Sequence, residues 1–196
     1  LNWSKPRRRC LFLGVRGGGR AVACQCDVSD SASAKAAVER AVREFGALRV
    51  VVSNAAALVP VTTLAEMEED HWHKTLAVNL TGAFFICKHA IPRLRAAGGG
   101  SIVLVASQMA RVANAGQAAY CATKGALVQL AKGMALDHVA DNIRVNTLSP
   151  GGTATDRLAA RFGDLETAER VFSRNTSPMK LYFMIGHPTE GEEDFE

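Results

Sequence analysis

Three short runs of apolar, largely β-branched residues constrain the fold of this chain most strongly. They read LRVVVS at 48–53, SIVLVA at 101–106 and IRVNTL at 143–148. Such runs are typical of strands that are buried on both faces in a parallel sheet. Apolar residues recur at helical spacing between and beside them, over about 32–45, 64–97 and 117–139. Strands that alternate with helices predict parallel crossover units, and therefore a doubly wound α/β sheet with helices on both faces.

The two ends of the chain carry weaker patterns. Residues 1–20 are expected to be irregular, and residues 20–28 (RAVACQCDV) are expected to form a short strand. A further helix is expected over about 155–172. The chain is therefore divided into three expected parts, which are an irregular N-terminal segment at 1–16, a partial domain at 17–172 and a C-terminal segment at 173–196.

Composition and charge exclude several classes of protein. Hydrophobic residues make up 48% and charged residues 21%, which is ordinary for a globular domain and excludes a mainly disordered chain. The net charge of +4 is small and scattered, so no nucleic-acid partner is expected. No apolar run reaches the roughly 20 residues of a membrane-spanning helix. The apolar stretch near the start is too short for a secretory signal, and we expect a cytoplasmic protein.

The five cysteines do not form paired metal-ligand motifs. Cys24 and Cys26 come nearest to one, but they are separated by a single residue within an apolar, alternating stretch. We interpret the cysteines as reduced, partly buried thiols, and we expect no metal site.

Polar or turn-forming residues follow each predicted strand, where ligands bind in sheets of this class. These residues are Asp27, Asn54, Ser107 and Pro150. Tyr120 and Lys124 are four residues apart in the predicted helix at 117–139, so their side chains share one face. Each residue also has a purely structural interpretation: an amphipathic helix face for Tyr120 and Lys124, a turn for Ser107 and a cap for Asp27.

Taken together, these residues resemble the motifs of the short-chain dehydrogenase/reductase family. The matching elements, in chain order, are Asp27-Val28, NAA at 54–56, VNLTG at 78–82, Ser107, YCATK at 120–124, RVNTLSPG at 144–151 and Thr155. The resemblance covers about residues 17–172 and implies a Rossmann-like fold. It also implies that NAD or NADP is the cofactor.

The resemblance assigns a role to each matching residue. Tyr120 is implied as the acid or base of the reaction, Lys124 as the cation that stabilises its phenolate and holds the nicotinamide ribose, and Ser107 as the group that orients the substrate oxygen. Asn79 is implied to kink its helix and to hold a water. The implied cofactor-binding residues are Asp27, Val28, Asn54, Ala55, Tyr120, Lys124, Pro150, Gly151 and Thr155.

The sequence departs from the family pattern at both ends. A glycine-rich turn of the form TGxxxGxG is missing, since the glycines at 14 and 17–19 have the wrong spacing and lie too close to Asp27. The fold is therefore expected to lack the first βαβ unit and the last strand. Residues 178–196 weakly resemble a segment of radical S-adenosylmethionine enzymes, although no CxxxCxxC motif is present.

These observations lead to one expected function and one alternative. The expected function is NAD(P)-dependent hydride transfer between nicotinamide and a small carbonyl or secondary alcohol, weak or absent in this chain alone. We also expect a homo-oligomer built through the two long helices. The alternative is a non-catalytic remnant that acts only through this helical surface. The apolar residues at 126–136 that would form the surface could equally belong to the core: Ala126, Leu127, Leu130, Ala131 and Met134.

Overall fold

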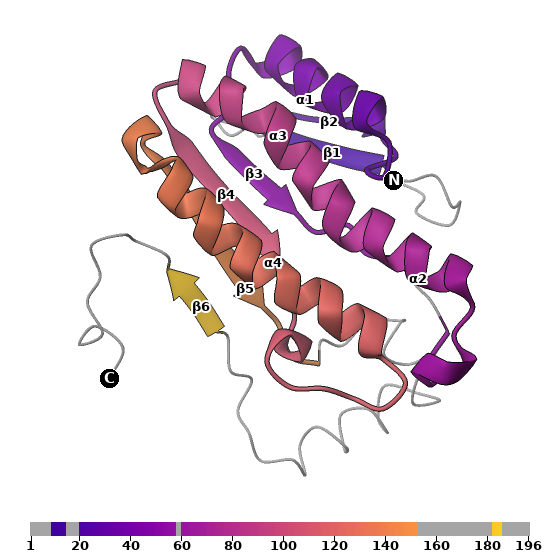
Figure 1. The fold of residues 1–196 in the computed structure, drawn as a ribbon. Coiled ribbons are helices and arrows are strands. Elements are labelled where there is room, and N and C mark those ends of the chain that lie inside the picture. Colours follow the sequence, from indigo (N-terminus) through magenta and orange to yellow (C-terminus); the bar gives the residue numbers. More distant parts are fainter. Residues whose placement is uncertain (1–8, 15–19, 58–59, 153–181, 186–196) are drawn as a thin grey trace, which may run out of the picture.

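The computed structural model describes residues 9–14, 20–57, 60–152 and 182–185 (Figure 1). Its strands are β1 (Arg9–Gly14), β2 (Arg20–Gln25), β3 (Val50–Ser53), β4 (Gly100–Val105), β5 (Ile143–Ser149) and β6 (Tyr182–Ile185). Its α-helices are α1 (Ser31–Phe45), α2 (Glu69–Leu76), α3 (Gly82–Ala96) and α4 (Ala118–Asp137). No helix in these ranges is long and apolar enough to cross a membrane.

The larger sheet has the strand order β3-β4-β5-β6. Strands β3, β4 and β5 are parallel, with Ile102 of β4 beside Val51 of β3 and Val145 of β5. This arrangement confirms the expected Rossmann-like α/β fold with a parallel sheet. A further strand, β6, pairs with β5 beyond the three parallel strands. It runs antiparallel, so it extends the sheet without a crossover connection.

The expectation that residues 1–20 are irregular is also wrong. Residues Arg9–Gly14 form β1, which pairs antiparallel with β2 in a separate two-stranded sheet, from Arg9 opposite Gln25 to Gly14 opposite Arg20. The connection between them is only five residues long and holds three glycines, which suits a hairpin. Strand β2 therefore does not join the parallel sheet.

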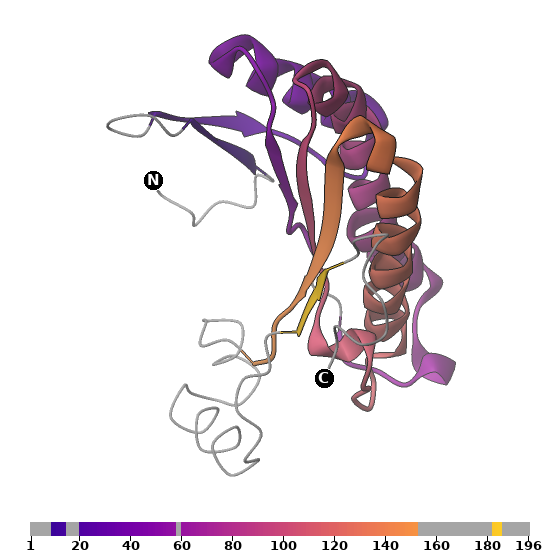
Figure 2. The ribbon, with the colours of Figure 1, turned by 90° about the vertical axis from the view of Figure 1, so that its left-hand side faces the viewer.

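All the α-helices of the described residues lie on one face of the larger sheet, contrary to the expected cover on both faces (Figure 2). Within β3, Val51 points toward the helices and is 8% exposed, whereas Val50 and Val52 point the other way and are each 60% exposed. The connections β3–α3–β4 and β4–α4–β5 each lead to the next strand in the same direction across the sheet. Right-handed crossovers that share a direction place their helices on the same face.

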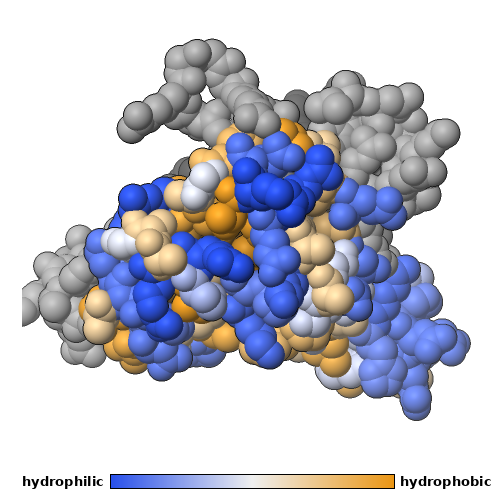
Figure 3. Space-filling view, turned by 90° about the horizontal axis from the view of Figure 1, so that it is seen from above, coloured by the Kyte–Doolittle hydropathy of each residue, from blue (hydrophilic) through white to orange (hydrophobic). Residues whose placement is uncertain are grey.

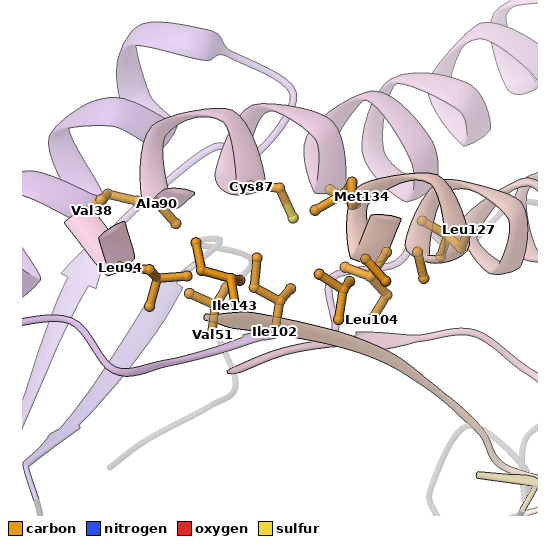
Figure 4. Close-up of a cluster of buried hydrophobic side chains, with 14 residues drawn as sticks. Val38, Val51, Cys87, Ala90, Leu94, Ile102, Leu104, Leu127, Met134 and Ile143 are labelled. Atoms are coloured by element: carbon orange, nitrogen blue, oxygen red, sulfur yellow. The ribbon is translucent and has the colours of Figure 1, made fainter. Parts of the chain in front are cut away.

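The main core lies between this face of the sheet and helices α3 and α4 (Figure 4). Ile102, Leu104 and Val145 from the strands meet Leu94 of α3 and Leu127 of α4 there. Ala131 and Met134 are buried in the same cluster, and Leu130 packs against it. The apolar face of α4 that we considered for dimerisation therefore belongs largely to the core of the single chain.

Cys87 of α3 lies in this core, and burial raises the pKa of its thiol to about 12. The charged form of a thiol is poorly solvated among hydrocarbon side chains, which is why its pKa rises. Cys87 therefore behaves as a small apolar residue, as the sequence suggested for the cysteines in general.

A second cluster fastens α1 and the segment after β2 to the start of α3. Val28 is buried in it, and its side chain lies directly over Gly82. A Cβ atom added at Gly82 would lie 2.8 Å from Cγ2 of Val28. Gly82 is therefore needed because the chain at Val28 approaches the helix backbone closely.

A bidentate ion pair joins the end of α3 to the turn before β5, near the amino ends of the strands. Figure 3 shows the molecule from this end, where hydrophobic side chains appear between hydrophilic ones. Arg95 donates from Nε to Oδ1 of Asp141 at 2.7 Å and from Nη2 to Oδ2 at 2.6 Å. These bonds, together with one to His138, lower the pKa of Asp141 to about 2.

We predict that Gly82→Ala destabilises the chain by about 1–3 kcal/mol through overpacking. Adding Val28→Ala in the double variant should recover much of this loss, because it removes the side chain that the new methyl group meets. Gly133→Ala in α4 is the matched control, since nothing lies within 4 Å of its Cβ position. It should stabilise the chain by about 0.5–1 kcal/mol. Urea unfolding of the four proteins tests this, and equal effects of the two glycine variants would refute it.

Acid should weaken the Arg95–Asp141 pair selectively. The pKa of Asp141 is lower in the folded chain than in the unfolded one, so its contribution to stability is fully present above about pH 4 and is lost as the pH falls through about 2. The difference in urea midpoint between wild type and Asp141→Asn should therefore be constant above about pH 5 and shrink below about pH 4. A difference that stays constant down to about pH 2 would contradict this account.

Candidate functional site

The carboxyl ends of β3, β4 and β5 lie at one edge of the sheet, because the three strands are parallel. Asn54 follows β3, Ser107 follows β4 after one residue, and Pro150 follows β5. Two backbone hydrogen bonds continue past the paired strands, from Ala106 N–H to Leu148 O at 2.8 Å and from Gln108 N–H to Pro150 O at 2.9 Å. These bonds hold the Ser107 loop beside the Pro150 loop.

Helix α4 brings Tyr120 and Lys124 to the same edge. The side chain of Lys124 is only 3% exposed, and its Nζ donates a hydrogen bond of 2.6 Å to Val105 O at the end of β4. The same Nζ lies 5.6 Å from the centre of the Tyr120 ring. A buried ammonium needs such partners, since burial without them is costly. The structure thus joins Tyr120, Lys124 and the end of β4 into one cluster.

Ser107 adopts an extended backbone and begins the short 3-10 turn at Gln108–Ala110. Its Oγ accepts a hydrogen bond of 3.2 Å from Met109 N–H. The structural interpretation of Ser107 as a turn-forming residue therefore holds. It is compatible with a role in binding, because a hydroxyl oxygen that accepts a hydrogen bond keeps a proton to donate.

Asn79 lies in a π-helical turn (Ala77–Thr81) that interrupts the expected long helix at 64–97 between α2 and α3. Its side chain is 1% exposed. The amide oxygen Oδ1 accepts a 2.7 Å hydrogen bond from Ala57 N–H, and Nδ2 donates a 3.3 Å bond to Oγ1 of Thr123. Turns of this kind often occur at functional sites, since the extra residue redirects a side chain. Here the side chain connects the loop after β3 with α4.

The first predicted binding residues lie in a tight turn after β2. The carboxylate of Asp27 accepts hydrogen bonds from the N–H of Ser29 at 3.0 Å and from its hydroxyl at 2.6 Å. The carboxylate of Asp30, three residues on, accepts from Ser33 N–H and caps α1. The side chain of Val28 packs on Gly82, so any contact of Val28 with a ligand would use its backbone.

The other predicted binding residues are placed as follows. Asn54 and Ala55 are exposed at the end of β3, and Pro150 and Gly151 are partly buried beside the Ser107 loop. Thr155 lies outside the described residues. These residues therefore lie at the same edge of the sheet as the cluster of Tyr120 and Lys124.

Sequence reasoning missed two parts of the site. The first is Thr123, and the only sequence feature that could have indicated it was its place within the YCATK motif. The second is a hollow beside Tyr120, lined by Ala57, Pro60, Met67, Gly116, Gln117, Ala119 and Tyr120. These residues come from two distant segments, so no spacing in the sequence relates them.

The comparisons with known proteins agree on one family. The family model for short chain dehydrogenases matches residues 12–166. D-threitol dehydrogenase of Mycolicibacterium smegmatis is 40% identical over 143 residues, which are 73% of this chain and 54% of that protein. Cis-4-hydroxycyclohexanecarboxylate dehydrogenase of Sinomonas cyclohexanicum is 36% identical over 148 residues, which are 76% of this chain and 59% of that protein.

A solved structure shows the same likeness. Gluconate 5-dehydrogenase of Burkholderia cenocepacia, in complex with NADP and tartrate, superimposes with a TM-score of 0.69 at 32% identity, covering 76% of this chain and 58% of that one. The chain thus spans between 54% and 59% of the length of these three proteins. The weak resemblance of residues 178–196 to radical enzymes stays unsupported, since the family match ends at residue 166.

We predict that Asn79→Ala costs about 1–3 kcal/mol in the free energy of unfolding, because it leaves the buried Ala57 N–H without its acceptor. The control is Asn114→Ala in the exposed segment before α4, which should change the free energy by less than about 0.5 kcal/mol. Chemical denaturation measures both values. Equal stability of the two variants would show that the Ala57–Asn79 bond is unimportant.

Proposed function

The chain belongs to the short-chain dehydrogenase family, and on that premise we propose that it is an NAD(P)-dependent oxidoreductase acting on a small carbonyl or secondary alcohol. One observation carries the proposal: at the carboxyl edge of the parallel sheet the Lys124 ammonium of α4 lies near the Tyr120 ring and contacts Val105 O, two residues before Ser107.

The proposed chemistry follows from the groups of the chain. The nicotinamide, when bound, supplies or accepts the hydride. A carbonyl oxygen that receives negative charge needs a proton, and the hydroxyl of Tyr120 would donate it; for alcohol oxidation the phenolate would remove it. The Lys124 ammonium stabilises that phenolate by its charge. The Ser107 hydroxyl would donate a hydrogen bond to the same substrate oxygen and orient it.

The described residues fit the nicotinamide–ribose half of the cofactor better than the pyrophosphate. The Lys124 ammonium contacts Val105 O, and an ammonium is a hydrogen-bond donor of the kind that holds ribose hydroxyls. Pro150 and Gly151 beside the Ser107 loop offer further backbone groups for the nicotinamide end, whereas the family resemblance assigns Asn54 to the adenosine ribose. None of these residues distinguishes NAD from NADP.

We further propose that these 196 residues by themselves have weak activity or none. The supporting observations are the missing glycine-rich turn, the placement of β1 and β2 outside the parallel sheet, and the position of β3 at the end of the described sheet, with no further strand beside it. A pyrophosphate is normally bound at a helix N-terminus next to such a turn. Without it, the cofactor would be held mainly at its nicotinamide end.

The proposed substrate class is a secondary alcohol or the matching ketone. D-threitol and cis-4-hydroxycyclohexanecarboxylate, named for the two relatives, are both hydroxy compounds. The hollow beside Tyr120 has both apolar and polar groups in its lining, among them the Gln117 side chain, and it does not select between these two kinds of compound.

Oligomerisation and location are secondary proposals. Phe84 of α3 and Leu136 of α4 stay exposed as single apolar side chains, and the proposed homo-oligomer built through these helices rests on the family resemblance. A cytoplasmic location is supported by the buried thiols of Cys26 and Cys87, which suit a reducing compartment. The non-catalytic alternative shares the same surface, so only cofactor binding separates the two functions.

The test is a fluorescence titration of the purified chain with NADH and with NADPH. We expect measurable binding that Lys124→Met weakens about tenfold or more, since charge-assisted hydrogen bonds are lost. Tyr120→Phe should leave binding within about threefold and abolish turnover of secondary alcohols. Lys35→Met on the exposed side of α1 is the control and should change nothing. No binding up to millimolar cofactor would exclude the enzyme and favour the remnant.

A further inference from the structure

A series of buried hydrogen bonds passes through Thr123 and joins three elements of the site. We propose that Thr123 is a positioning residue: it holds the amide of Asn79 in one orientation, and thereby fixes the loop after β3 against the Tyr120–Lys124 turn of α4. The inference rests on the proposed function to the extent that both segments bind one cofactor.

The bonds are short enough and buried enough to act as a unit. Thr123 is 0% and Asn79 is 1% exposed. The Thr123 hydroxyl donates to Tyr120 O at 2.9 Å, Asn79 Nδ2 donates to Thr123 Oγ1 at 3.3 Å, and Ala57 N–H donates to Asn79 Oδ1 at 2.7 Å. Ala57 is itself buried, and it lies three residues after Asn54. The two bonds of the Asn79 amide are therefore shielded from water, and the bond to Tyr120 O is partly shielded.

The direction of every bond is determined by the two backbone groups at the ends. Ala57 N–H can only donate, so it must meet the oxygen of the Asn79 amide and not the nitrogen. The nitrogen then faces Thr123, whose oxygen must accept. The Thr123 proton is left to point at Tyr120 O, which can only accept. A single arrangement satisfies all the groups, and it requires a side chain that both accepts and donates at position 123.

A comparison with Thr75 shows that helix structure alone does not account for Thr123. Thr75 is also 0% exposed, and its hydroxyl donates to His71 O at 2.7 Å within its own helix. Such bonds within a helix add little to its stability. Thr123 makes the same kind of bond to Tyr120 O and, in addition, accepts from Asn79 across an element boundary. This additional bond from Asn79 is the one that connects α4 to the loop after β3.

The consequence for binding follows from where the ends of the series lie. One end is the loop that presents Asn54 and Ala55, and the other is the turn of α4 that carries Tyr120 and Lys124. If the amide of Asn79 can rotate, Ala57 N–H loses its acceptor for part of the time and the loop loosens. A ligand that contacts both segments then has to restore their spacing, which lowers its affinity.

The test combines backbone amide hydrogen exchange, followed by NMR, with cofactor titration. The variants are Thr123→Val, which has the same shape without a hydroxyl, Thr123→Ser, which keeps the hydroxyl, and Thr75→Val as the matched control. Exchange of Ala57 N–H is compared with that of Val145 N–H in β5, which reports general loss of stability.

We expect Thr123→Val to lower the protection of Ala57 about tenfold relative to Val145, and to weaken NADH or NADPH binding about three- to tenfold. Thr123→Ser should restore both values, and Thr75→Val should leave both unchanged relative to Val145. The inference is overturned if Thr123→Val and Thr75→Val affect Ala57 equally.

The same measurements separate this inference from the proposed function. If no protein binds cofactor, including the wild type, the proposed function fails while a selective effect on Ala57 still supports the positioning role. If the wild type binds and Thr123→Val binds equally well, the link from Thr123 to the cofactor is refuted, whatever happens at Ala57.

Discussion

The shape of the molecule depends on two right-handed crossovers that run in the same direction, β3–α3–β4 and β4–α4–β5. They align the three parallel strands so that their carboxyl ends share one edge, and they place α3 and α4 on one face. The candidate site at that edge and the exposed valines on the opposite face are both consequences. The main core fills the space between the helices and the covered face, and it includes residues of β4, β5 and α4, which carry the site.

The burial of polar side chains fixes their positions in the site. Lys124 and Asn79 are almost inaccessible to water, so their positions are set by the few groups that can satisfy them. For Lys124 these include Val105 O at the end of β4, and for Asn79 they are Ala57 N–H and Thr123 Oγ1. A hydrogen bond in such surroundings has few competitors, and the cost of leaving one unmade is high. The arrangement is therefore well determined in the absence of any ligand.

The expectations that were confirmed depend on patterns within short segments of the sequence, whereas most of those that failed depend on contacts between distant segments. The strands at 48–53, 101–106 and 143–148 and the helices around them were predictable because burial imposes a local pattern on each segment. The antiparallel β6 and the burial of Leu127 and Met134 were not, because each depends on a partner far away in the sequence. The same is true of the hollow beside Tyr120. The pairing of β1 with β2 joins neighbours in the chain, but residues 1–20 carried no strand pattern that predicted it.

The sequence by itself determined the three buried parallel strands and the family, and it predicted the residues for proton transfer, because motif spacing on single elements is a local property. Only the tertiary structure decided which residues meet: that the Lys124 ammonium contacts the end of β4, that Thr123 connects Asn79 to α4, and that one face of the sheet has no helix among the described residues. Contacts of this kind depend on how separate elements pack. No spacing within one element specifies that packing.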